Sequence, residues 1–282
     1  MNKKQAGLMA IIGGTTILGI KLSAYFVSNS VALLSDALES IVNIAASGLV
    51  LFSVHISERP ADDSHNYGHE KIEDISSMLE GLFILVAALM IVYAAIERLF
   101  EARLLELNLA IGISMLATAL NAGLSYSLAR TAKKSGSAAL EGDARHLLSD
   151  VISSVAVWVG LFVVEVTGWT SMDSLLAFAV AALIARMGAG LVYKSSHHLM
   201  DRSCREEERK IKEVLLRHKF HFIDFHEMKT RRHGNHVFAE LHLSVDSALR
   251  VKDAHDFTDH LEDELREELP NVNLTIHIEP KE

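Results

Sequence analysis

Six long apolar stretches fill most of the first two thirds of the sequence, and they constrain its fold more than any other feature. Each is about 20 residues or longer, which is the length that an α-helix needs to cross the roughly 30 Å hydrocarbon core of a bilayer. The stretches lie at residues 7–28, 31–56, 75–99, 106–129, 147–166 and 171–193. The sequence therefore predicts a membrane domain, an all-α bundle of six transmembrane helices, within residues 1–200.

Basic residues in the connections predict the orientation of this bundle. Lys3 and Lys4 precede the first stretch, which is too long for a signal peptide and lacks a convincing cleavage site. The connections after the second and fourth stretches carry six further Lys and Arg residues, the first and fifth carry none, and the third carries Arg98 and Arg103. Because short cytoplasmic loops are enriched in Lys and Arg, we expect a multi-pass protein of the cell (inner) membrane with both termini in the cytoplasm.

The composition changes after the last apolar stretch. Residues 201–282 are dense in Glu, Arg, His and Lys, and their patterns predict a helix, two strands joined at Gly234-Asn235, a second helix and a last strand. The expected elements lie at residues 205–218, 222–231, 236–245, 251–269 and 273–279. The order αββαβ predicts a small α/β domain of ferredoxin-like or metallochaperone-like type, an open sheet with helices on one face.

Charge and cysteine content exclude two classes of function. The formal net charge is −9, so the chain has no basic surface of the kind that nucleic-acid-binding proteins need. The single cysteine, Cys204, excludes a disulfide framework or a thiolate cluster within one chain. An acidic chain with 15 histidines instead favours binding of cations.

Polar and ionisable residues occur in or directly beside two of the apolar stretches. An ionisable side chain at mid-membrane costs roughly 2.5–3.5 kcal/mol, so such residues usually face an interior or a transport pathway. Asp36, Glu39 and Asn43 are spaced three and four apart on one helical face, and His146 and Asp150 are four apart on another stretch. Two such helices predict a four-ligand nitrogen and oxygen cage that Zn²⁺ and its neighbours accept. Helix capping at Asp36 and a structural role for His146 remain open alternatives.

Three segments together resemble the cation diffusion facilitator family of metal transporters, in its bacterial and archaeal zinc- or iron-type efflux branch. They are residues 29–40 (NSVALLSDALES), residues 59–71 (RPADDSHNYGHEK) and residues 146–150 (HLLSD). The resemblance implies a homodimeric secondary transporter, not an enzyme, that exchanges divalent metal for protons. It also implies that residues 201–282 form a cytoplasmic metal-binding and dimerisation domain.

The resemblance implies a membrane transport site with an unusual first pair of ligands. Its members would be Glu39, Asn43, His146 and Asp150, where related zinc and iron transporters carry Asp and Asp, or His and Asp, at the first two positions. Asn43 offers only a neutral carbonyl oxygen. Asp36 and Glu80 are accessory candidates for the missing oxygen, and a hydrogen bond between helices is an equally good interpretation of each.

Further sites are implied outside the apolar stretches. A loop site would use Asp62, His65 and His69, with Asp63 as an alternative carboxylate and a solvated loop as the alternative interpretation. Lys71 and Asp201 match a charge pair that links the two domains in the family. The cytoplasmic site would comprise His226, His242, His255, His277 and Glu279. The other histidines of this region are expected at the surface, namely His218, His221, His233, His236 and His260.

The predicted cargo is a divalent transition metal. The donor set favours Zn²⁺ first, then Fe²⁺ and Mn²⁺, with Co²⁺ and Cd²⁺ possible. A transport-deficient metal sensor or partner subunit of the same fold is the alternative that Glu39 and Asn43 keep open. An intramembrane metalloprotease is disfavoured because residues 69–73 (HEKIE) lack the second histidine of the His-Glu-x-x-His motif.

Overall fold

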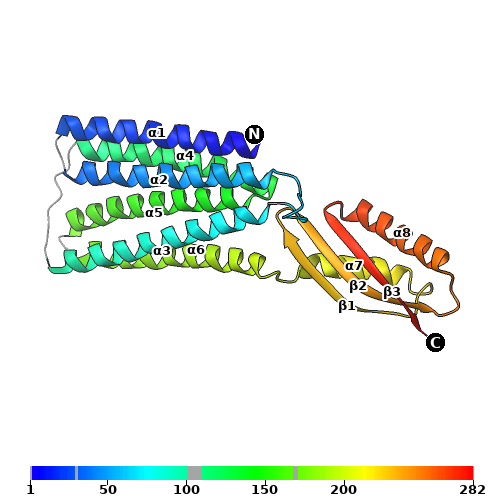
Figure 1. The fold of residues 1–282 in the computed structure, drawn as a ribbon. Helices are drawn as coiled ribbons and strands as arrows, with labels where there is room; N and C mark the ends of the chain where they lie inside the picture. The colour runs from blue at the N-terminus through cyan, green and yellow to red at the C-terminus, as the bar shows by residue number, and fades with distance from the viewer. Residues whose placement is uncertain (1, 29–30, 101–108, 168–170, 282) are drawn as a thin grey trace. The chain divides into compact units, whose positions relative to one another are not determined.

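The computed structural model describes residues 2–28, 31–100, 109–167 and 171–281, although the side chains of residues 24–39 and of some others near the helix ends are not described. The chain divides into two units, Met1–Ser196 and His197–Glu282. The first unit contains only helices and the second contains a small sheet with two helices (Figure 1). Both expected fold classes, the helical membrane domain and the C-terminal αββαβ domain, are confirmed.

Six long helices form the first unit and run up and down along one another (Figure 1). Each exceeds the length that spans a bilayer's hydrocarbon core. Their bounds are α1 (Lys3–Ser28), α2 (Val31–Ser57), α3 (Lys71–Phe100), α4 (Leu109–Ser135), α5 (Ala138–Thr167) and α6 (Ser171–Leu199). Three of them begin well before the apolar stretches that predict them, because α1 and α3 each start four residues earlier than expected and α5 starts nine residues earlier.

The apolar core of the bundle falls into two clusters. One cluster is built by α1, α2, α4 and α5, with Val50, Leu128 and Leu140 fully buried in it. The other is built by α3 and α6 around Ile84 and Leu191, with a contribution from α5. The bundle therefore consists of a four-helix group and a two-helix pair.

Glycines bring α3 and α6 into close contact. A Cβ atom added at Gly81 would lie 2.8 Å from Val192 Cγ2 and 3.0 Å from the Gly188 carbonyl oxygen. A Cβ atom added at Gly188 would in turn lie 2.8 Å from the Gly81 oxygen. Only a residue without a side chain fits at either position, so the two backbones pack directly against each other.

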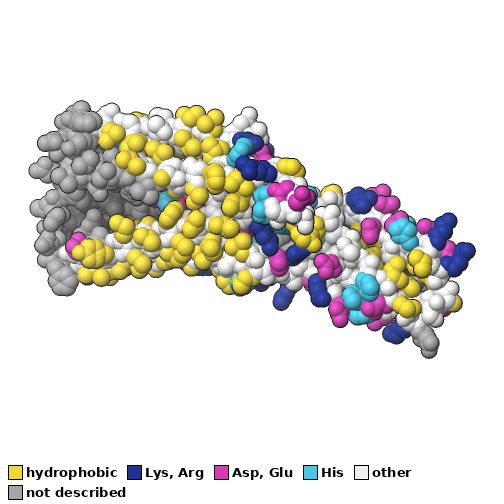
Figure 2. Space-filling model, in the orientation of Figure 1, with side chains coloured by type: hydrophobic (Ala, Val, Ile, Leu, Met, Phe, Trp, Pro, Cys, Tyr) yellow, Lys and Arg dark blue, Asp and Glu magenta, His cyan; other side chains and the backbone are white. Residues whose placement is uncertain are grey.

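The outer surface of the bundle is apolar. Figure 2 shows hydrophobic side chains over the visible, described part of the bundle, with charged and histidine side chains gathered at the end where α1 begins and α2 ends. On α3, Leu89, Met90 and Tyr93 are each about two-thirds exposed. Within the described residues, Lys3–Ser23, Lys71–Glu97 and Ala177–Leu199 are long and apolar enough to cross a membrane, and Asn43–Ser57 is a shorter apolar helical segment.

The second unit follows the predicted order. Its elements are α7 (Arg205–Arg217), β1 (Asp224–His233), β2 (His236–Asp246), α8 (Val251–Glu268) and β3 (Val272–Lys281). The sheet order is β1-β2-β3, with β1 antiparallel and β3 parallel to the central strand β2. The parallel pairing is possible because α8 carries the chain back to the start of the sheet.

One face of this sheet is covered by the two helices. Leu241 and Leu243 of β2 pack in one buried cluster with Ile211 of α7 and with Leu261 and Leu265 of α8. Side chains alternate between the faces of a strand, so His242, which lies between these two leucines, points to the opposite, uncovered face. That face is where the predicted histidines of β2 and β3 lie.

Candidate metal sites

The predicted transport site brings α2 and α5 together. The Asn43 Nδ2 group donates a hydrogen bond of 2.7 Å to Asp150 Oδ2, and Asn43 Oδ1 lies 3.1 Å from His146 Nε2. Asn43 and His146 are buried and Asp150 is half-buried. The amide therefore stands between the imidazole and the carboxylate, and three of the four expected ligands are in contact.

Glu80 of α3 completes this group from a third helix. Its side chain is fully buried, and Oε2 lies 3.4 Å from His146 Nδ1. Among the described residues, neither carboxylate oxygen has a hydrogen-bond partner. Gly142 permits the approach of α5, because a Cβ atom there would lie 3.0 Å from Glu80 Cγ. The accessory candidate is thus a member of the cluster, which we call the membrane cluster: Asn43, Glu80, His146 and Asp150.

A buried carboxylate that the sequence interpretation missed lies one helical turn before His146. Asp143 is 1% exposed and accepts a hydrogen bond of 3.1 Å from the Ser47 hydroxyl. Ser47 follows Asn43 by four residues, so α2 presents an amide and a hydroxyl to the same region of α5. The spacing Asp143, His146, Asp150 was the available signal, because all three share one face of a helix.

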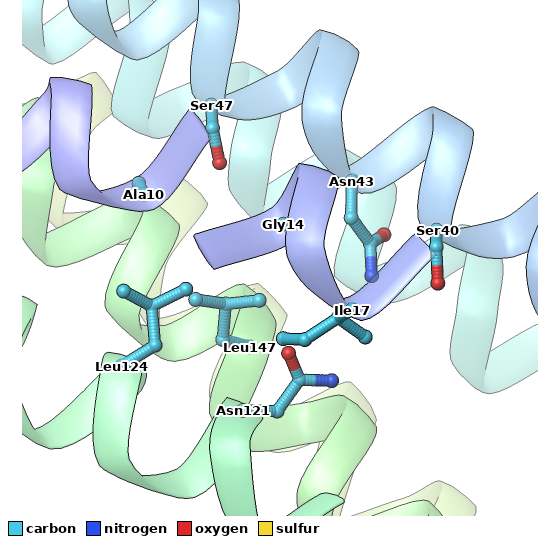
Figure 3. Close-up of a pocket in the computed structure, with 9 residues that line it drawn as sticks. All are labelled: Ala10, Gly14, Ile17, Ser40, Asn43, Ser47, Asn121, Leu124 and Leu147. Atoms are coloured by element: carbon cyan, nitrogen blue, oxygen red, sulfur yellow. The ribbon is translucent and has the colours of Figure 1, made fainter. Parts of the chain in front are cut away.

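A small pocket lies beside Asn43 (Figure 3). Asn43, Ser40 and Ser47 line it from α2, and Asn121 lines it from α4. Apolar residues of α1, α4 and α5 form the remainder of the wall. Asn43 therefore takes part both in the contacts with His146 and Asp150 and in the wall of this pocket.

Two predicted residues of α2 fall outside the description. The side chains of Asp36 and Glu39 are among those that are not described, so their positions relative to Asn43 remain predictions. In the sequence of α2, Glu39 lies one helical turn and Asp36 two helical turns before Asn43.

The loop between α2 and α3 gathers its three predicted ligands. Asp62 Oδ1 lies 3.4 Å from His65 Nδ1, and Asp62 Oδ2 lies 3.4 Å from His69 Nε2. Gly68, with a φ of 91°, makes the turn between the two histidines, whose ring centroids are 4.4 Å apart. The three ligand atoms lie within 4.8 Å of one another, and Asp62 rather than Asp63 supplies the carboxylate of this group.

Hydrogen bonds hold Asp62 in its charged form. The Ser64 hydroxyl donates at 2.8 Å and the His65 backbone N–H donates at 2.7 Å to Asp62 Oδ1. These bonds lower the pKa of Asp62 to about 2. The carboxylate is therefore ionised throughout the physiological pH range, as a metal ligand must be.

The predicted charge pair lies at the ends of two helices. Lys71 is the first residue of α3. Asp201 follows α6 in the second unit, where it adopts a φ of 54° and places Oδ2 4.0 Å from Arg231 Nη1. The pairing of Lys71 with Asp201 stays a prediction.

The uncovered face of the sheet carries a second exposed cluster. His242 Nδ1 lies 2.8 Å from Glu279 Oε1, and His226 Nε2 lies 3.2 Å from Glu279 Oε2. His277 is paired with His242 in the parallel register, and their ring centroids are 4.8 Å apart. The hydrogen bond with His242 is the main reason that the pKa of Glu279 is lowered. We call His226, His242, His277 and Glu279 the sheet cluster.

A bulge in β1 sets the position of His226. The register between β1 and β2 shifts between His226 and Lys229, and Glu227 adopts a φ of 50°. Such a bulge adds a residue to one strand and redirects the side chains beside it. His226 thereby faces His242, with ring centroids 5.4 Å apart.

Two histidines of the second unit lie elsewhere than the sequence indicates. His255 is exposed on α8, where Nε2 lies 3.5 Å from Asp259 Oδ2, and it is not part of the sheet cluster within one chain. The expectation that His233 lies at the surface is wrong, because this residue is only 8% exposed. It is the last residue of β1, directly before the β1–β2 turn, and it is paired with His236 of β2.

Comparison with known proteins identifies the family to which the chain belongs. Residues 8–200 match the cation efflux transmembrane domain, and residues 205–281 match the cytoplasmic domain of cation efflux proteins. The chain belongs to the cation efflux family. This is the cation diffusion facilitator family that the three sequence segments resemble, so the expected membership is confirmed, and the chain is a membrane transporter of cations.

Relatives of this cation efflux protein match it along almost its whole length. An uncharacterized transporter of Synechocystis, sll1263, is 37% identical over 98% of this chain and 89% of its own length. The cation-efflux pump FieF of Pectobacterium atrosepticum is 31% identical over 93% of this chain and 87% of its own length.

A solved structure matches a smaller part of the chain. The zinc form of CzrB, described as a putative zinc transporter, is 36% identical over 28% of this chain and 88% of the CzrB chain, with a TM-score of 0.26.

Proposed function

We propose that this cation efflux protein is a homodimer that exports divalent transition-metal ions in exchange for protons, with Zn²⁺ the preferred cargo, Fe²⁺ and Mn²⁺ next, and Co²⁺ and Cd²⁺ also accepted. The membrane cluster is the observation that carries the proposal. Its imidazole, amide and two carboxylates converge from α2, α3 and α5 inside an apolar bundle. Uncompensated carboxylates in such a place are costly, and a doubly charged ion offsets that cost.

The donor set matches the chemistry of zinc and its neighbours. His146 offers nitrogen, while Asp150 and Glu80 offer carboxylate oxygens and Asn43 a carbonyl oxygen. Two carboxylates balance the two charges of the ion. Glu39, one turn before Asn43 on α2, is the further ligand that the family resemblance implies.

Protons would compete with the metal for the same groups. A metal ion requires deprotonated ligands, so binding releases protons and protonation releases the metal. We infer that the ion enters from the cytoplasm, where the basic connections lead us to expect both termini. Exposure of the site to the opposite, more acidic side then expels the ion, and His146 is the natural proton carrier because unperturbed histidine titrates near pH 6.5.

Metal flux into proteoliposomes tests the proposal directly. Asp150→Asn keeps the size of the side chain and removes a charged ligand. We expect Zn²⁺ flux to fall by at least about 10- to 100-fold, which is the loss seen when only the groups that support metal ligands are changed. Glu97→Gln is the matched control, because Glu97 is an exposed carboxylate on α3, outside the membrane cluster. Normal flux in Asp150→Asn would refute the site assignment.

Asn43 favours one alternative, a metal sensor or partner subunit of the same fold that has lost transport. Such a protein would bind Zn²⁺ at the membrane cluster and show no flux for any metal. A panel of Zn²⁺, Fe²⁺, Mn²⁺, Co²⁺ and Cd²⁺ in the same vesicles separates the two functions and ranks the cargo.

A further inference from the structure

We propose that His218, His260 and Glu264 form a separate site for a divalent transition-metal ion that joins α7 to α8 in the C-terminal unit. His218 is the residue that ends α7, and its backbone N–H donates to the Leu215 carbonyl. His260 and Glu264 are four residues apart on α8, so they project from the same face of that helix. One ligand atom from each residue lies within 4.8 Å of the others.

The contacts within this group, which we call the helix cluster, bring three donors to one point. His218 Nε2 lies 2.6 Å from Glu264 Oε2, and the His218 and His260 rings are perpendicular with centroids 5.1 Å apart. Ligands of a tetrahedral Zn²⁺ at about 2.0–2.1 Å are separated by roughly 3.3 Å. His218 Nε2 and Glu264 Oε2, at 2.6 Å, are in direct contact and would move apart by about 0.7 Å to admit the ion. His260 is exposed at the helix surface, so its ring can turn toward the ion without disturbing the core.

A hydrogen bond between the helices does not account for all three residues. One neutral imidazole is enough to donate to Glu264 Oε2, and the second imidazole adds nothing to that bond. A cation, in contrast, is bound by a lone pair from each imidazole and by the carboxylate. Two imidazoles and one carboxylate form a ligand set suited to zinc, and they leave a fourth position for water.

Arg217 holds the carboxylate in place for this role. Its Nη1 group donates to Glu264 Oε1 at 2.8 Å, so Oε2 is the oxygen turned toward the histidines. The same guanidinium also binds both oxygens of Glu268, one turn later on α8. Partners that orient a ligand in this way are a regular feature of metal sites.

The helix cluster is independent of the sheet cluster. The sheet cluster lies on the uncovered face of the sheet, whereas the helix cluster joins the two helices that cover the other face. Part of its environment is apolar and aromatic, because His218 lies 6.3 Å from the Phe257 ring and His221 stacks on that ring at 5.4 Å. An ion bound here would tie the end of α7 to α8 and stabilise the folded unit as free metal rises.

The test is the number of zinc ions bound by the purified full-length protein, measured by equilibrium dialysis against micromolar Zn²⁺. We expect His260→Ala to lose one ion per chain relative to the natural sequence, and His218→Ala to lose the same ion. The double variant should lose no more than either single variant. His236→Ala is the control, because His236 is exposed at the start of β2 and belongs to none of the clusters.

Thermal unfolding keeps the proposal testable if a variant is less stable. His260 is exposed, so His260→Ala should unfold at the same temperature as the natural sequence without zinc, and should gain less stability when zinc is added. Full zinc binding by His260→Ala would overturn the proposal. Loss of two different ions in the two single variants, or binding only at millimolar zinc in the natural sequence, would overturn it as well.

Discussion

In the membrane cluster, the amide nitrogen and the amide oxygen of Asn43 contact two different residues. Its amide N–H donates to Asp150 and its carbonyl lies beside His146. An aspartate at the same position would offer two acceptors and repel Asp150. The carboxylate that Asn43 does not provide is instead present on α3, where Glu80 lies against the other nitrogen of His146. A carboxyl group therefore lies beside the imidazole from a different helix.

Exchanging the amide of Asn43 and the carboxyl group of Glu80 between the two positions tests whether Glu80 supplies the carboxylate that position 43 lacks. Glu80→Gln should lower Zn²⁺ flux by about 10- to 100-fold because it removes one of two carboxylates. The double variant Asn43→Asp, Glu80→Gln restores the number of carboxylates and should recover much of the flux. Initial rates of zinc uptake into proteoliposomes measure both effects. A double variant no faster than Glu80→Gln alone would show that Glu80 does not act as the substitute carboxylate.

At the scale of elements, the contact between α3 and α6 depends on two residues without side chains. Backbone atoms of Gly188 and Val192 lie 3.0 Å from the position of a Cβ atom at Gly81. A backbone neighbour cannot rotate away as a side chain can. The helices must therefore separate if either glycine is replaced.

Gly81→Ala should destabilise the bundle by about 1–3 kcal/mol, the usual cost of inserting a methyl group into a closely packed contact. The midpoint of thermal unfolding in detergent measures this loss. Gly190→Ala is the matched control on α6, because nothing lies within 4 Å of a Cβ atom there. Equal stability of Gly81→Ala and Gly190→Ala would contradict the close contact.

The kind and order of the elements could be predicted from the sequence, whereas several boundaries could not. Apolar stretches of membrane length and the turn at Gly234-Asn235 are local signals, and they predict the six helices and the αββαβ order. The start of α5 is different, because Glu141, Asp143 and Arg145 look like part of a polar loop. They are helical because tertiary contacts, such as that of Asp143 with Ser47, accommodate the polar side chains.

The predicted site residues show the same division. The spacing of His146 with Asp150 and of His65 with His69 is local, and each pair lies together in the structure. The contact of Glu80 with His146 joins residues that are distant in sequence, so the sequence names Glu80 as a candidate and does not predict its contact with His146. The helix cluster joins α7 to α8 in the same way, and spacing along the chain does not indicate it.

For the whole molecule, a proton gradient should control the direction of metal movement. We expect vesicles with an acidic interior to accumulate Zn²⁺ faster than vesicles without a pH difference, because protons on the far side displace the metal from its ligands. A protonophore that abolishes the gradient should remove the difference. Zinc uptake followed with an internal fluorescent indicator measures it. The same uptake rate with and without the gradient would contradict exchange for protons.

The division of the bundle into a four-helix group and a two-helix pair places the ligands on bodies with separate cores. Asn43, His146 and Asp150 belong to the first group, and Glu80 belongs to the second. Any sliding of α3 along α5 changes the 3.4 Å separation of Glu80 from His146 while the other three residues keep their geometry. A shift of one helical turn, about 5.4 Å, would withdraw the Glu80 carboxylate from the ion. Affinity for the cargo would then rise and fall with the relative position of the two groups of helices.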